Sequence, residues 1–157
     1  MENYMKLEIA AMGENESFAR SAVAAFALSL NPSLSELSDI KTAVSEAVTN
    51  CIVHAYARGG EKNTIVIECT AEKGQDNGAL HIKITDHGCG IEDIEQATLP
   101  FFTTLESEER SGMGFTIMQT FMSEFSVKSK RGEGTQIRML KRIGGGENEK
   151  VRDRLNA

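Results

Sequence analysis

The sequence predicts an α+β protein built as a two-layer sandwich, in which helices cover one face of a mixed, mostly antiparallel sheet. Short segments with alternating apolar and polar residues have the period of half-buried strands, and two longer segments keep the 3.6-residue period of amphipathic helices. A loop rich in glycine and polar residues joins two of the strand segments, as in a hairpin. Because each kind of element has one apolar face, the two layers are expected to pack together.

The first part of the chain is predicted to form a strand followed by two helices. Alternation predicts a strand over Tyr4–Ala11. Apolar residues at helical spacing predict a helix over Asn15–Leu30, which Asn31 and Pro32 end. A longer helix is predicted over Glu36–Tyr56, where the apolar stripe is continuous.

The remaining chain is predicted to complete the sheet. The predicted strands are Thr64–Thr70, Leu80–Asp86, Ser126–Lys130 and Thr135–Ile143, and the predicted helical stretches are Ile91–Ala97 and Phe115–Phe125. The acidic segment Leu99–Gly114 has no period and is predicted to be a mobile loop. With 157 residues, the chain is expected to form a single domain over 1–143 and a disordered polar tail over 144–157.

Charge and cysteine content disfavour several classes of protein. Lys and Arg number 17 against 23 Asp and Glu, and a net charge of −6 has the wrong sign for binding nucleic-acid phosphate. The three cysteines, Cys51, Cys69 and Cys89, are odd in number and far apart, so neither a disulfide framework nor a CxxC metal pair can be built from them. No apolar run reaches the ~20 residues of a membrane span. A cytoplasmic protein without direct nucleic-acid or membrane contact is expected.

Glycine pairs mark three turns, at Gly88 and Gly90, Gly112 and Gly114, and Gly132 and Gly134. The second pair opens a predicted helix, where bare backbone N–H groups can bind phosphate oxygens. A plain helix-start turn is the alternative interpretation. No GxxxxGK[ST] or GxGxxG string is present, so neither a P-loop nor a dinucleotide fold is supported.

Arg110 is the only Lys or Arg between Glu92 and Val127, in a segment that is otherwise acidic. A single guanidinium there would suit a terminal phosphate. A salt bridge to Glu106 or Glu109 would explain it equally well.

Glu46 and Asn50 are four residues apart on the long predicted helix, so their side chains are neighbours on the face away from the apolar stripe. Such a face is ordinarily solvated. The functional hypothesis is that Asn50 offers its amide oxygen to Mg²⁺ while Glu46 acts as base for a hydroxyl that attacks the last phosphate of a nucleotide.

Asp86 ends a predicted strand and precedes Gly88 and Gly90. An ionised carboxylate only accepts hydrogen bonds, so in a pocket it would select adenine, which has an exocyclic amino group, over guanine, which has a keto oxygen. A structural role in starting the turn is the alternative.

Four motifs occur in an order and spacing that resemble the N box and the three glycine boxes of the GHKL ATPases, which include gyrase and the histidine kinases. They are EAVTN at 46–50, DHGCG at 86–90, SGMG at 111–114 and GT at 134–135. NESFARSAVAAF at 15–26, PFFTT at 100–104 and ERSGMGFTIM at 109–118 further resemble the sporulation anti-sigma-F factors. The loops at 58–63, 73–78 and 105–108 do not match that pattern.

The resemblance implies a Bergerat-type sandwich that binds ATP and Mg²⁺, holds a sigma factor inactive, and phosphorylates a serine of an anti-anti-sigma factor. It implies Glu46 as base, Asn50 as metal ligand and Arg110 as the lid arginine. The nucleotide-binding residues that it implies are Asn50, Asp86, Gly88, Gly90, Thr104, Ser111, Gly112, Met113, Gly114, Phe115 and Thr135.

Arg20 is the only charged residue between Glu16 and Glu36, among alanine, serine and large apolar residues. Such an arginine suits an interface anchor, and the resemblance implies that it meets both protein partners; an ordinary surface arginine is the alternative. A homodimer is expected, through the edge of the N-terminal strand.

Two functions remain open. The first is a serine protein kinase that is also an anti-sigma factor. The second is a nucleotide-gated module that sequesters the sigma factor without significant phosphotransfer. The catalytic half of a histidine kinase is disfavoured, because no phosphoacceptor helix pair fits in the chain.

Overall fold

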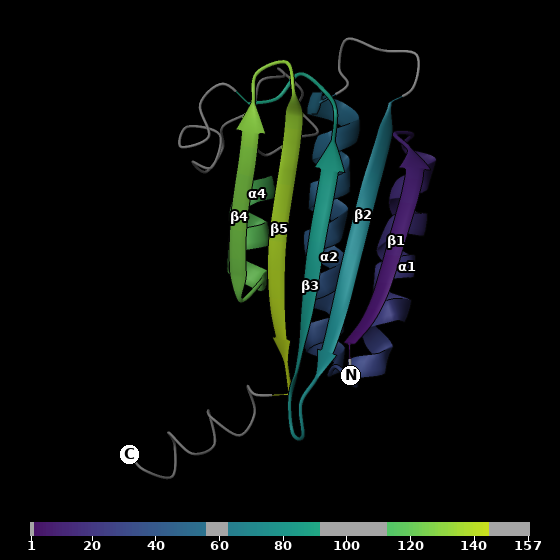
Figure 1. Ribbon diagram of the computed structural model, residues 1–157, viewed down its shortest axis with the longest axis vertical. Coiled ribbons are helices and arrows are strands. Elements are labelled where there is room, and N and C mark those ends of the chain that lie inside the picture. The colour runs from purple at the N-terminus through teal and green to yellow at the C-terminus, as the bar shows by residue number, and fades with distance from the viewer. Residues whose placement is uncertain (1, 56–62, 92–112, 145–157) are drawn as a thin grey trace.

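A computed structural model describes residues 2–55, 63–91 and 113–144 (Figure 1). In chain order its elements are β1 (Glu2–Ala10), α1 (Glu14–Ala27), a 3₁₀ turn (Leu28–Leu30), α2 (Leu34–Asn50), a π-helical turn (Cys51–Ala55), β2 (Thr64–Lys73), β3 (Gly78–Asp86), α4 (Gly114–Phe121), β4 (Glu124–Lys130) and β5 (Gly134–Ile143).

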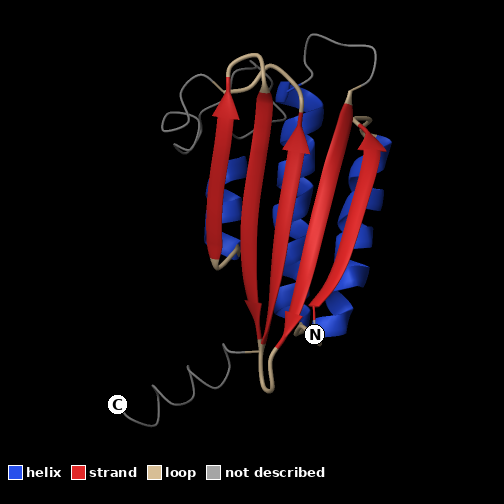
Figure 2. Cartoon of the chain, viewed as in Figure 1, coloured by secondary structure: helices blue, strands red, loops and turns tan. Residues whose placement is uncertain are grey.

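The strands form one five-stranded sheet in the order β1-β2-β3-β5-β4. All four pairings between the described strands are antiparallel, so the described sheet contains no parallel pair of the kind that a mixed sheet would have. The helices lie against one face of this sheet (Figures 1 and 2). The predicted two-layer α+β sandwich is confirmed.

The core lies between the helices and the apolar face of the sheet. Inward-facing strand residues such as Ile67, Ile82 and Ile137 are almost fully buried against helix residues such as Val23 and Val44. Burial of one such side chain stabilises the fold by roughly 1.5–3 kcal/mol. The alternation seen in the sequence therefore corresponds to one dry and one wet face of the sheet.

Helix α2 begins earlier than predicted and changes its geometry near its end. Ser33 caps it: the Ser33 hydroxyl accepts from the N–H of Glu36, and the Glu36 carboxylate accepts from the N–H of Ser33. After Asn50 the chain continues as the π turn, where the sequence predicted an uninterrupted α-helix. Single π turns occur often at functional sites.

The predicted helix Phe115–Phe125 is too long. Helix α4 ends at Phe121, and Phe125 belongs to β4. Phe125 and Val127 lie on the same face of that strand, and both pack against the core. The ring of Phe125 contacts that of Phe115, with centroids 5.7 Å apart. A helical period of 3.6 and a strand period of 2 both place these apolar residues toward the core, so the sequence of this short segment does not distinguish a helix from a strand.

Several expectations lie outside the described residues. They are most of the stretch Ile91–Ala97, nearly all of the loop Leu99–Gly114, the 58–63 loop except for Asn63, and the tail beyond Gly144. In the part of the chain that the structure describes, no helix is both long enough and apolar enough to cross a membrane.

Candidate functional site

Glu46 and Asn50 lie side by side on α2 beneath the first residue of α4. Both are half-buried, where the sequence alone left a solvated face open. A Cβ atom at Gly114 would lie 3.0 Å from Asn50 Nδ2, 3.2 Å from Asn50 Oδ1 and 3.4 Å from Glu46 Oε2. Glycine therefore allows the start of α4 to approach these two side chains closely.

The N-terminus of α4 brings backbone donors to the same place. Met113 precedes the helix, and Gly114 and Phe115 form its first turn. The first N–H groups of a helix have no partner within it and favour an anion. Thr104, Arg110, Ser111 and Gly112, which the sequence assigns to the same site, lie outside the described residues.

Asp86 lies at the end of β3 and is only 4% exposed. Its Oδ1 accepts from the N–H of Gly88 at 3.0 Å and from the N–H of Thr135 at 3.2 Å. Burial raises the pKa of Asp86, although these bonds and a hydrogen bond from the Cys51 thiol lower it in part. The carboxyl thus joins three segments of the chain.

The Cys51 thiol is buried beneath Asp86. Burial is the main cause that raises the pKa of Cys51 well above its usual value, and the charge of Asp86 adds to it. The thiol therefore stays protonated and serves as a donor to the carboxyl. The π turn Cys51–Ala55 includes His54, whose carbonyl oxygen lies 3.4 Å from the Cys89 sulfur.

The loop after Asp86 is fixed against the turn between β4 and β5. Gly90 has a φ of +73°, and a Cβ there would lie 2.1 Å from the Lys130 carbonyl oxygen. The N–H of Gly132 donates to the carbonyl of Cys89 at 2.7 Å. Gly134 has a φ of +96° and would bring a Cβ within 2.2 Å of the Asp86 carbonyl oxygen. Side chains at Gly90 or Gly134 would therefore separate the two segments.

Thr135 is the second residue of β5, lies opposite Asp86 and is 8% exposed. Its hydroxyl lies 2.8 Å from the hydroxyl of Ser129, and Ser129 also accepts from the N–H of Ile91 at 2.7 Å. The end of β3 and the β4–β5 turn thus form one hydrogen-bonded unit at the same end of the sheet (Figure 1).

Arg20 lies in a groove between α1 and α2. Arg20 Nη1 lies 3.4 Å from Glu16 Oε1, and the same oxygen accepts from the hydroxyl of Ser45. The groove has a volume of about 330 Å³, and Glu46 is among its lining residues, with Arg20, Ser21, Ser38, Lys41, Thr42 and Ser45. Glu46 therefore borders both this groove and the start of α4.

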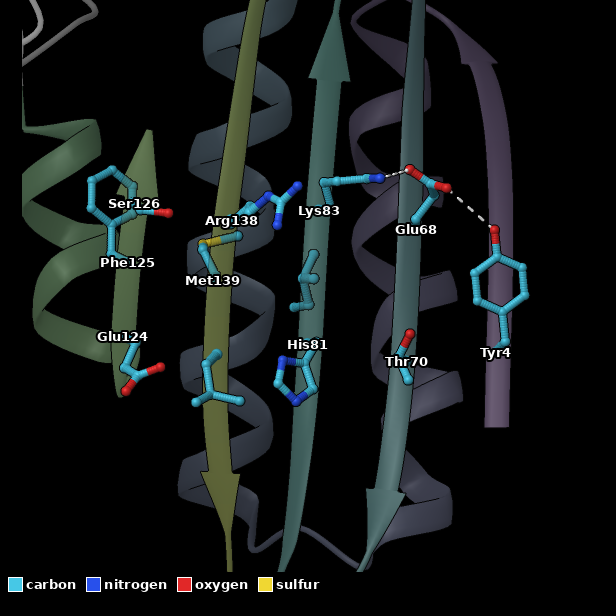
Figure 3. Close-up of a pocket in the computed structure, with 12 residues that line it drawn as sticks. Tyr4, Glu68, Thr70, His81, Lys83, Glu124, Phe125, Ser126, Arg138 and Met139 are labelled. Carbon is cyan, nitrogen blue, oxygen red and sulfur yellow. Dashed lines mark hydrogen bonds and ion pairs between the residues drawn. The ribbon is translucent and has the colours of Figure 1, made fainter. Parts of the chain in front are cut away.

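A second hollow, of about 610 Å³, lies on the sheet face opposite the helices. Figure 3 shows Lys83 and Tyr4 directed at Glu68 from neighbouring strands. Lys83 Nζ lies 2.7 Å from Glu68 Oε2, and the Tyr4 hydroxyl lies 3.3 Å from Glu68 Oε1. This hollow is larger, but Glu46, Asn50 and Asp86 do not line it, so volume alone would misplace the site.

Comparison with known proteins identifies the family. A model of the histidine kinase-like ATPase domain matches residues 9–141. The anti-sigma F factor of Caldanaerobacter subterraneus subsp. tengcongensis is 54% identical over 142 residues, which cover 90% of this chain and 95% of that protein. The chain belongs to the anti-sigma F factor family.

A second member of the anti-sigma F factor family, from Anoxybacillus flavithermus, is 48% identical over 143 residues, covering 91% of this chain and 94% of that one. Among solved structures, the RsbU and RsbW domains of a Mycobacterium tuberculosis protein match with a TM-score of 0.61 and 18% identity, over 90% of this chain and 32% of that one. The mycobacterial sensor histidine kinase MprB matches with a TM-score of 0.50 and 16% identity, over 90% of this chain and 98% of that one. At these identities the two structures show the fold alone.

The sequence-based expectation of an anti-sigma F factor with a kinase-type ATPase domain is thereby confirmed, and the domain implies ATP binding. The structure brings together Glu46, Asn50 and Gly114, and separately Asp86, Gly88, Gly90 and Thr135. The roles of Ser129 and Cys51 at this site were not predicted from the sequence. Ser129 could have been found as a polar residue at an inward position of a strand, after Phe125 and Val127.

Proposed function

We propose that this protein is an ATP- and Mg²⁺-dependent serine protein kinase that also acts as an anti-sigma factor. In this proposal it holds a sigma factor of the sigma-F type inactive in the cytoplasm and phosphorylates a serine of its anti-anti-sigma factor. Membership of the anti-sigma F family supports the pairing of these activities. The observation that carries the kinase is the packing of Glu46 and Asn50 directly beneath the N-terminus of α4.

In this proposal ATP lies between two groups of residues. Asp86 accepts a hydrogen bond from the adenine amino group, with Thr135 beside it, and Gly88 and Gly90 shape the loop. Met113, Gly114 and Phe115 offer the backbone of the α4 start to the phosphates, together with Thr104, Ser111 and Gly112. Arg110 is assigned to the terminal phosphate.

Asn50 is the proposed protein ligand of Mg²⁺. Its neutral amide oxygen is a hard donor, and Mg²⁺ commonly takes one or two protein ligands together with substrate phosphates. Asn50 is half-buried directly beneath the start of α4, where the phosphates are proposed to lie, so a site of that shared kind fits the residues present. The ion, when bound, neutralises charge on the phosphates.

Glu46 is the proposed general base. Its carboxylate takes the proton from the hydroxyl of the substrate serine, and the serine oxygen forms a bond to the γ-phosphorus. The bond from that phosphorus to the bridging oxygen breaks, ADP leaves with the electron pair, and phosphoserine remains. The proton on Glu46 passes to water. A general base typically contributes 10²–10⁴-fold to such a reaction.

The groove between α1 and α2 supports a protein substrate. It joins Arg20, the proposed partner anchor, to Glu46, so a chain bound at Arg20 can extend toward the proposed base. β1 is an edge strand of the sheet, which leaves its outer hydrogen-bonding groups for the proposed homodimer.

The test is incubation of the purified protein with radiolabelled ATP, Mg²⁺ and a candidate anti-anti-sigma protein, followed by mapping of the labelled residue. Phosphoserine on the added protein is the expected result. Capture of a sigma factor that depends on ATP, without any labelled product, would contradict the kinase and favour the nucleotide-gated sequestering module instead.

A further inference from the structure

Ser129, the sixth residue of β4, joins three segments around Thr135. Its hydroxyl accepts from the N–H of Ile91 at 2.7 Å and lies 3.0 Å from the carbonyl oxygen of Gly134. It also lies 2.8 Å from the hydroxyl of Thr135. Ser129 is half-buried and lies on the same face of β4 as Phe125 and Val127, which contact the core.

The directions of these bonds follow from counting protons. A serine hydroxyl has one proton to donate and two lone pairs with which to accept. The N–H of Ile91 occupies one lone pair. The carbonyl of Gly134 can only accept, so it takes the Ser129 proton. The remaining lone pair faces Thr135, whose hydroxyl supplies its own proton. In this arrangement all three contacts are hydrogen bonds.

We propose that Ser129 is a specificity-determining residue, because it commits the proton of the Thr135 hydroxyl and so makes Thr135 a hydrogen-bond acceptor for the nucleotide base. This inference rests on the proposed function, in which the base lies at Asp86 and Thr135. The ionised Asp86 carboxylate is likewise only an acceptor. An exocyclic amino group meets two acceptors favourably, whereas a keto oxygen finds no donor.

Removal of the Ser129 hydroxyl frees the Thr135 proton. Thr135 can then donate to a keto oxygen, which lowers the cost of binding the wrong base. A keto oxygen is rejected strongly when it faces only acceptors, because its hydrogen bond to water is not replaced. It is rejected less strongly when a hydroxyl can rotate and donate to it. Ser129 thus acts on base choice through Thr135, without contact to the base itself.

The experiment compares ATP with inosine triphosphate, which has a keto oxygen in place of the amino group. Affinities of both are measured by calorimetry with Mg²⁺ for wild type, Ser129→Ala, Ser129→Thr and Ser126→Ala. Wild type is expected to prefer ATP. In Ser129→Ala the preference should fall by roughly fivefold to tenfold, the equivalent of about one hydrogen bond.

Two variants serve as controls. Ser129→Thr keeps the hydroxyl and should restore the wild-type preference. Ser126→Ala removes an exposed hydroxyl from the opposite face of the same strand and should leave the preference unchanged. Unfolding midpoints of all variants separate loss of stability from change of specificity.

An unchanged ratio in folded Ser129→Ala would overturn the proposal. If that variant does not fold, Ser129→Cys takes its place. Sulfur is a weaker acceptor than oxygen for the Thr135 proton and should give an intermediate ratio, so a wild-type ratio would again overturn the proposal. Wild-type protein that binds neither nucleotide would contradict the proposed function itself, and the two failures are thus distinguishable.

Discussion

At the residue scale, Glu46 is the side chain on which phosphotransfer depends in the proposed mechanism. The substitution Glu46→Gln keeps its shape beneath Gly114 but removes the base. We expect phosphotransfer to fall by about 10²-fold or more, with ATP affinity within about tenfold of wild type, because a general base acts on the reaction more than on binding. Transfer is measured with labelled ATP and affinity by calorimetry.

Glu72 offers a matched control for this substitution, because it is an exposed glutamate on the far face of the sheet. Glu72→Gln should leave both quantities unchanged. Equal transfer by Glu46→Gln and wild type would remove Glu46 from the chemistry.

The buried carboxyl of Asp86 predicts a pH dependence of ATP binding. Burial raises its pKa in the free protein, so the protonated form persists to higher pH than in an exposed aspartate. An amino group that donates to the carboxylate favours the ionised form, so binding should release a proton. ATP affinity should therefore fall as pH decreases through the raised pKa and level off above it.

Calorimetry over a pH series, in buffers with different ionisation enthalpies, measures both the affinity and the released proton. Asp86→Asn keeps an oxygen that can accept from Gly88 and Thr135 but does not titrate. In that variant this part of the pH dependence should disappear. A wild-type affinity that is constant over the acid range would show that Asp86 does not bind the base as proposed.

At the scale of elements, the close approach of α4 to α2 depends on the missing side chain of Gly114. Gly114→Ala puts a methyl group 3.0 Å from Asn50 Nδ2 and 3.2 Å from Asn50 Oδ1, so the Asn50 amide must move by a few tenths of an ångström, whereas Glu46 Oε2 at 3.4 Å stays in ordinary contact. We expect a more than roughly tenfold loss of ATP affinity, while alanine's better helix propensity, up to about 1 kcal/mol, limits any loss of stability.

Gly13→Ala is the control, because it also adds a methyl group where a helix begins but meets nothing within 4 Å. Its ATP affinity should equal that of wild type. Calorimetry and thermal unfolding of both variants make the comparison, and equal ATP affinities would show that the α4 start does not hold the phosphates.

Secondary structure could be predicted from the sequence wherever the period was long and unbroken. The strand ending at Asp86 and the long helix carrying Glu46 follow directly from apolar spacing. The end of α4 at Phe121 could not be predicted. Phe115 and Phe125 are both apolar and pack on each other, and their spacing is compatible with one long helix as well as with a helix followed by a strand. The π turn after Asn50 could not be predicted either, because the spacing of apolar residues does not change where it begins.

At the scale of the whole molecule, the groove between α1 and α2 connects the outer surface with the proposed base. Arg20→Ala should weaken capture of the sigma and anti-anti-sigma partners by more than about 1 kcal/mol, because an anchoring arginine concentrates binding energy. ATP affinity should not change. Pull-down or surface plasmon resonance measures capture, and calorimetry measures ATP.

Arg142 provides the control, because it is exposed and ion-paired with Glu124 on β4. Arg142→Ala should leave capture unchanged. Equal capture by Arg20→Ala and wild type would return Arg20 to the role of a surface residue paired with Glu16.

The composition of the candidate site could be predicted in part because its residue types are chemically unusual in their positions. A carboxylate and an amide one turn apart, and an aspartate before two glycines, are visible in the sequence. The roles of Ser129 and Cys51 could not be predicted, because the contacts of Ser129 with Ile91 and of Cys51 with Asp86 join residues that are far apart along the chain. The pairing of β4 with β5 places Ser129 beside Thr135, and the packing of the end of α2 against the sheet places Cys51 beside Asp86.

The hydrogen bonds around Asp86 and Ser129 join protein atoms to one another. The amides of Gly88, Ile91 and Thr135 are held by side-chain oxygens, although two of them lie in a loop. In hydrogen–deuterium exchange these two loop amides should be protected like strand amides in the apo protein. These bonds preorganise the proposed adenine site, so binding of the base there would lose little affinity to ordering of the loop.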